Sequence, residues 1–129
     1  MSNKPKILLV DDDEIIAIVT TEALSPEYDV IYVDNGQAAL TALSQEVPDL
    51  VLLDVDMPGM SGYEVCRKLR QIPKVSDIPV IFLSGMVSEE DLLAGYQAGG
   101  SDYLIKPVSA DELCAKVKLQ LNKSDRCNH

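Results

Sequence analysis

Five short apolar segments recur along this chain, and each is followed by a stretch with helical periodicity. The expected strands span residues 6–10, 29–33, 50–53, 79–83 and 103–105. The first three expected helices span residues 14–24, 37–45 and 62–71. The fourth begins at Ser88 and ends at Gly99, and the fifth is capped by Ser109 and runs to about Leu121. Strands that alternate with helices favour a parallel sheet covered on both faces.

The order of the strands within such a sheet is limited, because crossover connections are right-handed. One common doubly wound order is 2-1-3-4-5, the flavodoxin-like (βα)5 arrangement of an α/β fold. Its switch point lies between the first and third strands, outside their carboxyl ends, where open α/β sheets bind their ligands.

Acidic residues occupy the ends of these same two strands. Asp11, Asp12 and Asp13 follow the first strand, and Asp54 follows the third. If the strands are neighbours, several carboxylates meet in a small volume, and like charges at short range repel unless a cation lies among them. The alternative from the residues alone is that these acids cap helices, the role we expect for Asp13 or Asp12.

Size, charge and cysteine usage restrict the class of protein. The chain has 129 residues, the size of one domain, and 47% of them are hydrophobic. A formal net charge of −10 argues against direct binding to nucleic acid or to an acidic membrane. No signal-peptide pattern, membrane-length apolar run or C-x-x-C spacing occurs, so we expect a reduced cytoplasmic protein.

Four motifs carry a resemblance to a known family. They are residues 9–13 (LVDDD), 53–62 (LDVDMPGMSG), 82–85 (FLSG) and 102–107 (DYLIKP). Together and in this order they resemble the response-regulator receiver domain of two-component signalling, the CheY-like superfamily. The resemblance implies a receiver domain over residues 1–123, with residues 124–129 as a tail or the start of a linker.

The resemblance also assigns the acids a role. It implies that Asp54 accepts a phosphoryl group from a phosphohistidine on a sensor kinase or a histidine phosphotransfer protein. Asp12 and Asp54 would bind Mg²⁺ or Mn²⁺ directly, Asp11 would act through water, and the backbone carbonyl of Asp56 would complete the set. Oxygen-only ligands are those that magnesium prefers.

Three further residues match motif positions near the strand ends. By resemblance Lys106 contacts the phosphoryl oxygens, with a cis bond to Pro107, and Ser84 binds the new phosphoryl group through its hydroxyl. Tyr103 would be the switch aromatic that moves inward and changes the face formed by the fourth helix, fifth strand and fifth helix. Taken from the residues alone, the alternatives are a solvated lysine, a turn serine and a half-exposed strand tyrosine.

The first helix carries more apolar residues than one core-facing stripe needs. We expect Ile16, Val19 and Ala23 to form the core stripe. Ile15 and Ile18 would then lie on a second face close to the acidic site. We hypothesise that these two residues dock the histidine-bearing helix of the partner, although core packing is the more common reason for apolar residues.

Two other positions and two rival functions complete the interpretation. In the resembled family, the positions of Asp56 and Met86 tune how long the phosphorylated state lasts.

A haloacid-dehalogenase-like phosphatase also uses an Asp-x-Asp nucleophile motif, here Asp54 and Asp56, but its acid pair should lie downstream. A binding module that is never phosphorylated would lack the acceptor, an acid or the lysine. We therefore expect a signalling switch that passes its state to an output domain or protein, and not an enzyme that acts on an external metabolite.

Overall fold

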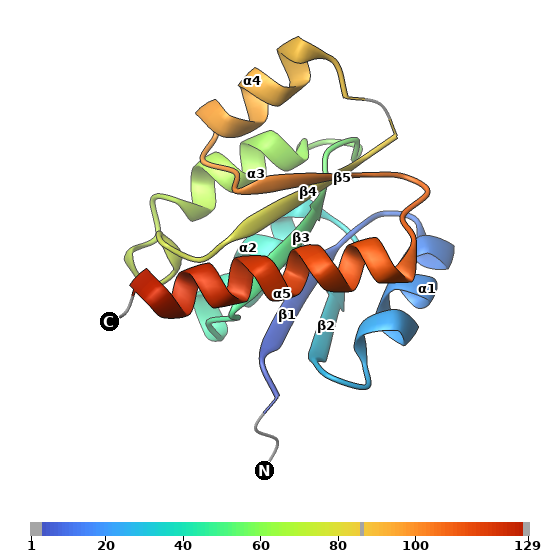
Figure 1. The fold of residues 1–129 in the computed structure, drawn as a ribbon. Helices are drawn as coiled ribbons and strands as arrows, with labels where there is room; N and C mark the ends of the chain where they lie inside the picture. Colours follow the sequence, from blue (N-terminus) through green and yellow to red (C-terminus); the bar gives the residue numbers. More distant parts are fainter. Residues whose placement is uncertain (1–3, 86, 128–129) are drawn as a thin grey trace.

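The computed structural model describes residues 4–85 and 87–127, and its centre is a five-stranded parallel sheet in the order β2-β1-β3-β4-β5 (Figure 1). The strands are β1 (Lys6–Val10), β2 (Asp29–Val33), β3 (Leu50–Asp54), β4 (Val80–Ser84) and β5 (Asp102–Ile105). The helices are α1 (Glu14–Leu24), α2 (Gly36–Gln45), α3 (Gly62–Leu69), α4 (Glu89–Gln97) and α5 (Ala110–Cys127), with a 3₁₀ turn at Pro73–Val75. The predicted α/β fold class and strand order are confirmed.

The register brings the carboxyl ends of the central strands together. Val10 of β1 pairs with Val33 of β2 on one side and with Leu53 of β3 on the other. Asp54, the last residue of β3, pairs with Leu83 of β4. The loops that follow β1, β3 and β4 therefore leave the same edge of the sheet, as the doubly wound topology requires.

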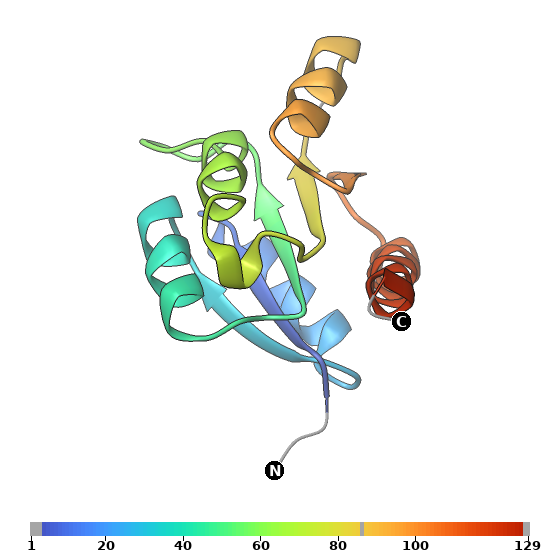
Figure 2. The same ribbon diagram turned by 90° about the vertical axis from the view of Figure 1, so that its left-hand side faces the viewer.

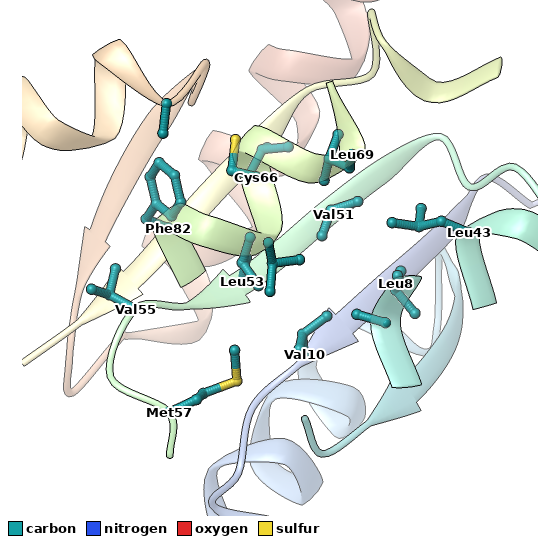
Figure 3. Close-up of a cluster of buried hydrophobic side chains, with 14 of the residues drawn as sticks. Leu8, Val10, Leu43, Val51, Leu53, Val55, Met57, Cys66, Leu69 and Phe82 are labelled. Carbon is teal, nitrogen blue, oxygen red and sulfur yellow. The ribbon is translucent and has the colours of Figure 1, made fainter. Parts of the chain in front are cut away.

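The core has two layers, because successive strand residues point to opposite faces of the sheet. Leu8 and Val10 pack toward α2 and α3, in the cluster drawn in Figure 3. Ile7 and Leu9 pack toward α1 and α5 instead. Figure 2 shows α2 and α3 on one side of the sheet and α5 on the other.

The face that α1 turns to the core differs from the prediction. Ala17, Thr20 and Leu24 are its buried residues, whereas Val19 is 59% exposed. The predicted stripe is therefore wrong at Val19, whereas Ile16 and Ala23 are partly buried and Ala23 packs against the core. Residues 15–19 are all apolar, so periodicity alone could not select the buried face.

Helix α5 is longer than expected. It continues to Cys127, past the expected end at Leu121 and across the proposed boundary between domain and tail at residue 123. That boundary stays a prediction. None of the helices within residues 4–85 and 87–127 has the length and hydropathy needed to cross a lipid bilayer.

Helix caps follow the sequence signals closely. The carboxylate of Asp13 accepts from the backbone N–H groups of Ile15 and Ile16, so Asp13 is the N-cap of α1. Ser88 caps α4 reciprocally with Asp91, and the hydroxyl of Ser109 accepts from the first turn of α5. These caps fix where the helices start relative to the loops at the acidic edge.

Candidate functional site at the carboxyl ends of the strands

Three carboxylates meet at the edge where β1 and β3 end. One oxygen from each of Asp11, Asp12 and Asp54 lies within 4.8 Å of the others. Asp11 and Asp12 follow β1 directly, and Asp54 is the last residue of the neighbouring β3. The structure thus brings the predicted acids together.

Backbone N–H groups hold two of these carboxylates. The N–H of Asp13 donates to Asp11 Oδ1 at 2.9 Å, and the N–H of Asp56 donates to Asp54 Oδ1 at 3.3 Å. Asp11 is fully buried and Asp54 is 3% exposed, whereas Asp12 is exposed to solvent. The cluster is therefore a buried pair with a third carboxylate at its mouth.

Lys106 supplies a positive charge within the cluster. Its Nζ lies 3.1 Å from Asp11 Oδ2 and 3.2 Å from Asp54 Oδ1. The backbone N–H of Lys106 donates to the carbonyl of Ser84, which ties the end of β5 to the end of β4. The peptide bond between Lys106 and Pro107 is cis, as predicted.

The environment disfavours the charged form of Asp54. Burial, followed by the negative charge of Asp11, raises the pKa of Asp54 to about 7, although Lys106 acts in the opposite direction. Burial lowers the pKa of Lys106, but its ion pair with Asp11 and the charge of Asp54 outweigh burial and raise that pKa overall. One ammonium therefore compensates the crowded carboxylates only in part.

The donor set fits a hard divalent cation. Asp11 Oδ2 is buried and makes no hydrogen bond, and the Lys106 ammonium 3.1 Å away is its charged neighbour. A buried carboxylate oxygen without a hydrogen bond, beside two more carboxylates, suits an ion that takes oxygen ligands. Asp56 is exposed, and its carboxylate is not among the three that meet here.

Two small residues, Gly62 and Ser84, lie close to the cluster. A Cβ on Gly62 would lie 2.3 Å from the carbonyl oxygen of Asp54, so only glycine permits this close approach of α3 to β3. Ser84 is buried at the end of β4, on the same edge as Asp54. Met86, the other predicted neighbour of the site, lies outside the described residues.

Tyr103 lies inward, beneath α4. Its side chain is 6% exposed, and its hydroxyl is hydrogen-bonded to the carbonyl of Asp91 and, at 2.9 Å, to the hydroxyl of Tyr63. A Cβ on Gly95 would lie 2.0 Å from that hydroxyl. Tyr103 is thus a buried aromatic and not a half-exposed one, and α4 accommodates it only because position 95 is glycine.

Sequence reasoning missed two tyrosines that contact these elements. Tyr63 shares the Asp91 carbonyl with Tyr103, and the hydroxyl of Tyr32 donates to the backbone carbonyl of Asp11 at 2.7 Å. The position of Tyr32 near the carboxyl end of β2 could have indicated its contact with the acidic loop that follows β1. Nothing in the sequence indicates the contact that Tyr63 makes across forty residues.

Solved structures with similar folds are receiver proteins. The fold matches a CheY-like response regulator receiver domain protein from Methanospirillum hungatei with a TM-score of 0.90 and 29% identity, covering 96% of this chain and 98% of that one. It matches a putative response regulator from Chloroflexus aurantiacus with a TM-score of 0.88 and 33% identity, covering 93% and 99%.

Sequence relatives give the same family. The PhoB phosphate regulon regulatory protein of Rhizobium meliloti is 37% identical over 121 residues, which are 93% of this chain and 53% of PhoB. The probable transcriptional regulator ycf27 of Pyropia yezoensis is 40% identical over 97% of this chain and 51% of its own length. The chain spans about half the length of these relatives. The response regulator receiver domain family matches residues 7–118, and the chain belongs to that family.

Proposed function

We propose that Asp54 accepts a phosphoryl group from a phosphohistidine and that the chain acts as a phosphorylation-dependent signalling switch. The observation that carries the proposal is the lysine and carboxylate cluster: a buried Asp54 with Asp11, Asp12 and the Lys106 ammonium around it. A lone capping aspartate would need none of these neighbours. Family membership supports the same role.

The transfer needs a nucleophile and a way to cancel charge. A carboxylate oxygen of Asp54 forms a bond to phosphorus while the P–N bond of the donor breaks, and the electron pair of that bond returns to the imidazole. Lys106 would offset negative charge on the phosphoryl oxygens, and the Ser84 hydroxyl would donate to one of them. Mg²⁺ held by Asp11, Asp12, Asp54 and the Asp56 carbonyl would supply further charge neutralisation.

Docking of the donor is proposed at α1. Ile15 and Ile18 are 74% and 58% exposed, although both are large and apolar. Ile15 lines a groove of about 340 Å³ that also reaches Lys106 and Pro107, whereas Ile18 lines a separate hollow beside Tyr32. Ile15 and Ile18 therefore border two different hollows on the exposed surface of α1. An apolar partner helix that lies across this surface, near Asp54, would cover both residues.

The docking proposal has its own test. Replacing Ile15 and Ile18 by serine should slow transfer from a phosphorylated histidine phosphotransfer protein and spare labelling by acetyl phosphate. Leu119→Ser, an exposed apolar residue on α5, is the matched control and should affect neither reaction. Equal loss with both donors would reject docking at α1.

Output is proposed at the surface of α4, β5 and α5. Large apolar side chains are exposed there, at 58% for Leu93, 53% for Tyr96 and 54% for Ile105. Tyr103 lies directly beneath this surface and contacts α4. Phosphorylation would shift Ser84 and favour the inward position that Tyr103 already occupies here, and would so change how this face meets an output domain or protein.

Phosphoimidazole tests the acceptor chemistry directly, because its P–N bond is that of phosphohistidine. With Mg²⁺ present, ³¹P NMR should show one protein-bound acyl phosphate and release of one imidazole per chain before slow decay. Continuous release of phosphate with no protein-bound species would favour a haloacid-dehalogenase-like phosphatase instead. A chain that takes up no phosphoryl group would contradict the switch.

A further inference from the structure

Strand β2 is the edge strand beside β1 (Figure 1), and it carries Tyr32. The side chain of Tyr32 reaches the acidic loop that follows β1. Its hydroxyl donates to the backbone carbonyl of Asp11 at 2.7 Å. The N–H of Asp11 donates in turn to the carbonyl of Val33 at 3.2 Å. Both polar backbone groups of Asp11 are thus held by neighbouring residues of β2.

The carbonyl that Tyr32 holds belongs to the peptide unit that leads into Asp12. That unit is planar, so fixing its oxygen fixes the direction in which the chain enters Asp12. Asp11 and Asp54 have other constraints, because they are buried and Lys106 lies beside both. Asp12 is exposed, so its orientation depends more on the backbone before it.

The Tyr32 hydroxyl is the donor in this contact, because a backbone carbonyl can only accept. The ring lies against α1, where it lines a hollow with Ala17 and Ile18. Tyr32 is 37% exposed, and the contact of its hydroxyl with Asp11 is one that a single-atom substitution can remove.

We propose that Tyr32 is a positioning residue for the divalent cation, and that its hydroxyl aligns Asp12 with Asp11 and Asp54. The inference rests on the proposed function, in which these acids hold Mg²⁺. Groups that orient metal ligands without touching the metal commonly affect metal affinity. Tyr32 would act in this way through the backbone of the ligand loop.

Tyr32→Phe is the test, because it deletes the hydroxyl and keeps the ring. The dissociation constant for Mg²⁺ alone, measured by titration calorimetry, should rise by about three- to ten-fold. Tyr28→Phe, which lies just before β2 and so at the opposite end of that strand from the acidic loop, is the matched control and should leave it unchanged. The rate of labelling by acetyl phosphate should fall at limiting Mg²⁺ and return to the native rate at saturating Mg²⁺.

Rescue by Mg²⁺ separates positioning from a general structural role. An unchanged dissociation constant in Tyr32→Phe would overturn the inference and leave the acceptor role of Asp54 intact. A labelling rate that stays low at saturating Mg²⁺ would also overturn it, since the defect would then lie elsewhere. A native chain that binds no Mg²⁺ would overturn the proposed cation site itself, and the role of Tyr32 with it.

Discussion

The ammonium of Lys106 lies 3.2 Å from the carboxylate of Asp54, and the two side chains are only 18% and 4% exposed. The same ammonium lies 3.1 Å from Asp11, so one positive charge serves two buried carboxylates. Charges removed from water in this way depend on one another, because an unpaired buried ion is costly. This arrangement makes stability sensitive to pH, to Lys106 and to the ion that the cluster would hold.

Stability in metal-free buffer should fall as the pH rises through the titration of Asp54. The pKa of Asp54 is about 7 in the folded chain against an ordinary value of 3.8. Between those values the folded state holds the proton and the unfolded state does not, so raising the pH favours unfolding by up to about 1.4 kcal/mol per pH unit.

Urea unfolding of the native chain and of Asp54→Asn from about pH 4 to pH 8 checks this, with EDTA present. The variant lacks the titrating group, so its stability relative to the native chain should increase toward neutral pH. Parallel curves for the two proteins would show that Asp54 titrates as an ordinary carboxyl group.

Removing the ammonium should destabilise the fold at neutral pH. Lys106→Met leaves Asp11 and Asp54 without their shared cation, and breaking a buried pair of this kind costs about 3 kcal/mol or more. The measurement is the free energy of unfolding in metal-free buffer at pH 8, with Lys118→Met, an exposed lysine of α5, as the control. A loss no larger than that of the control would mean that solvent already screens the cluster.

Substituting Gly95 tests the inward position of Tyr103. Glycine to alanine inside a helix ordinarily stabilises by roughly 0.5–1 kcal/mol. Here the added Cβ would meet the Tyr103 hydroxyl at 2.0 Å, so we expect Gly95→Ala to lower the free energy of unfolding instead, by about 1–3 kcal/mol.

A double-mutant cycle provides the control for Gly95. In a Tyr103→Ala background the same Gly95→Ala change has no ring to displace, so it should become neutral or stabilising. The same destabilisation in both backgrounds would place the cost of the substitution somewhere other than the tyrosine contact.

The strands and the acidic cluster were predictable because each depends on a local pattern. A buried parallel strand is a continuous apolar run, and an acid at its end lies at a defined edge of the sheet. The buried face of α1 was not predictable, since its apolar residues cover more than one face. Family resemblance, and not periodicity, supplied Lys106, Ser84 and Tyr103.

Contacts between distant elements had no sequence signal. Gly99 adopts φ of +100°, and a Cβ on Gly100 would lie 2.1 Å from the ring of Phe82. Arg70, at the end of α3, donates to the carbonyls of Gly99, Ser76 and Ile78 and so joins α3 to two other segments of backbone. Such contacts depend on which elements are neighbours, which only the folded chain defines.

Intact-mass spectrometry after incubation with acetyl phosphate and Mg²⁺ tests the central claim most directly. The native chain should gain the mass of one phosphoryl group, and the gain should vanish when EDTA replaces Mg²⁺. Asp54→Asn, which keeps the shape of the side chain and removes the nucleophilic carboxylate, should gain nothing. A phosphoryl group on Asp54→Asn, or none on the native chain, would contradict the account.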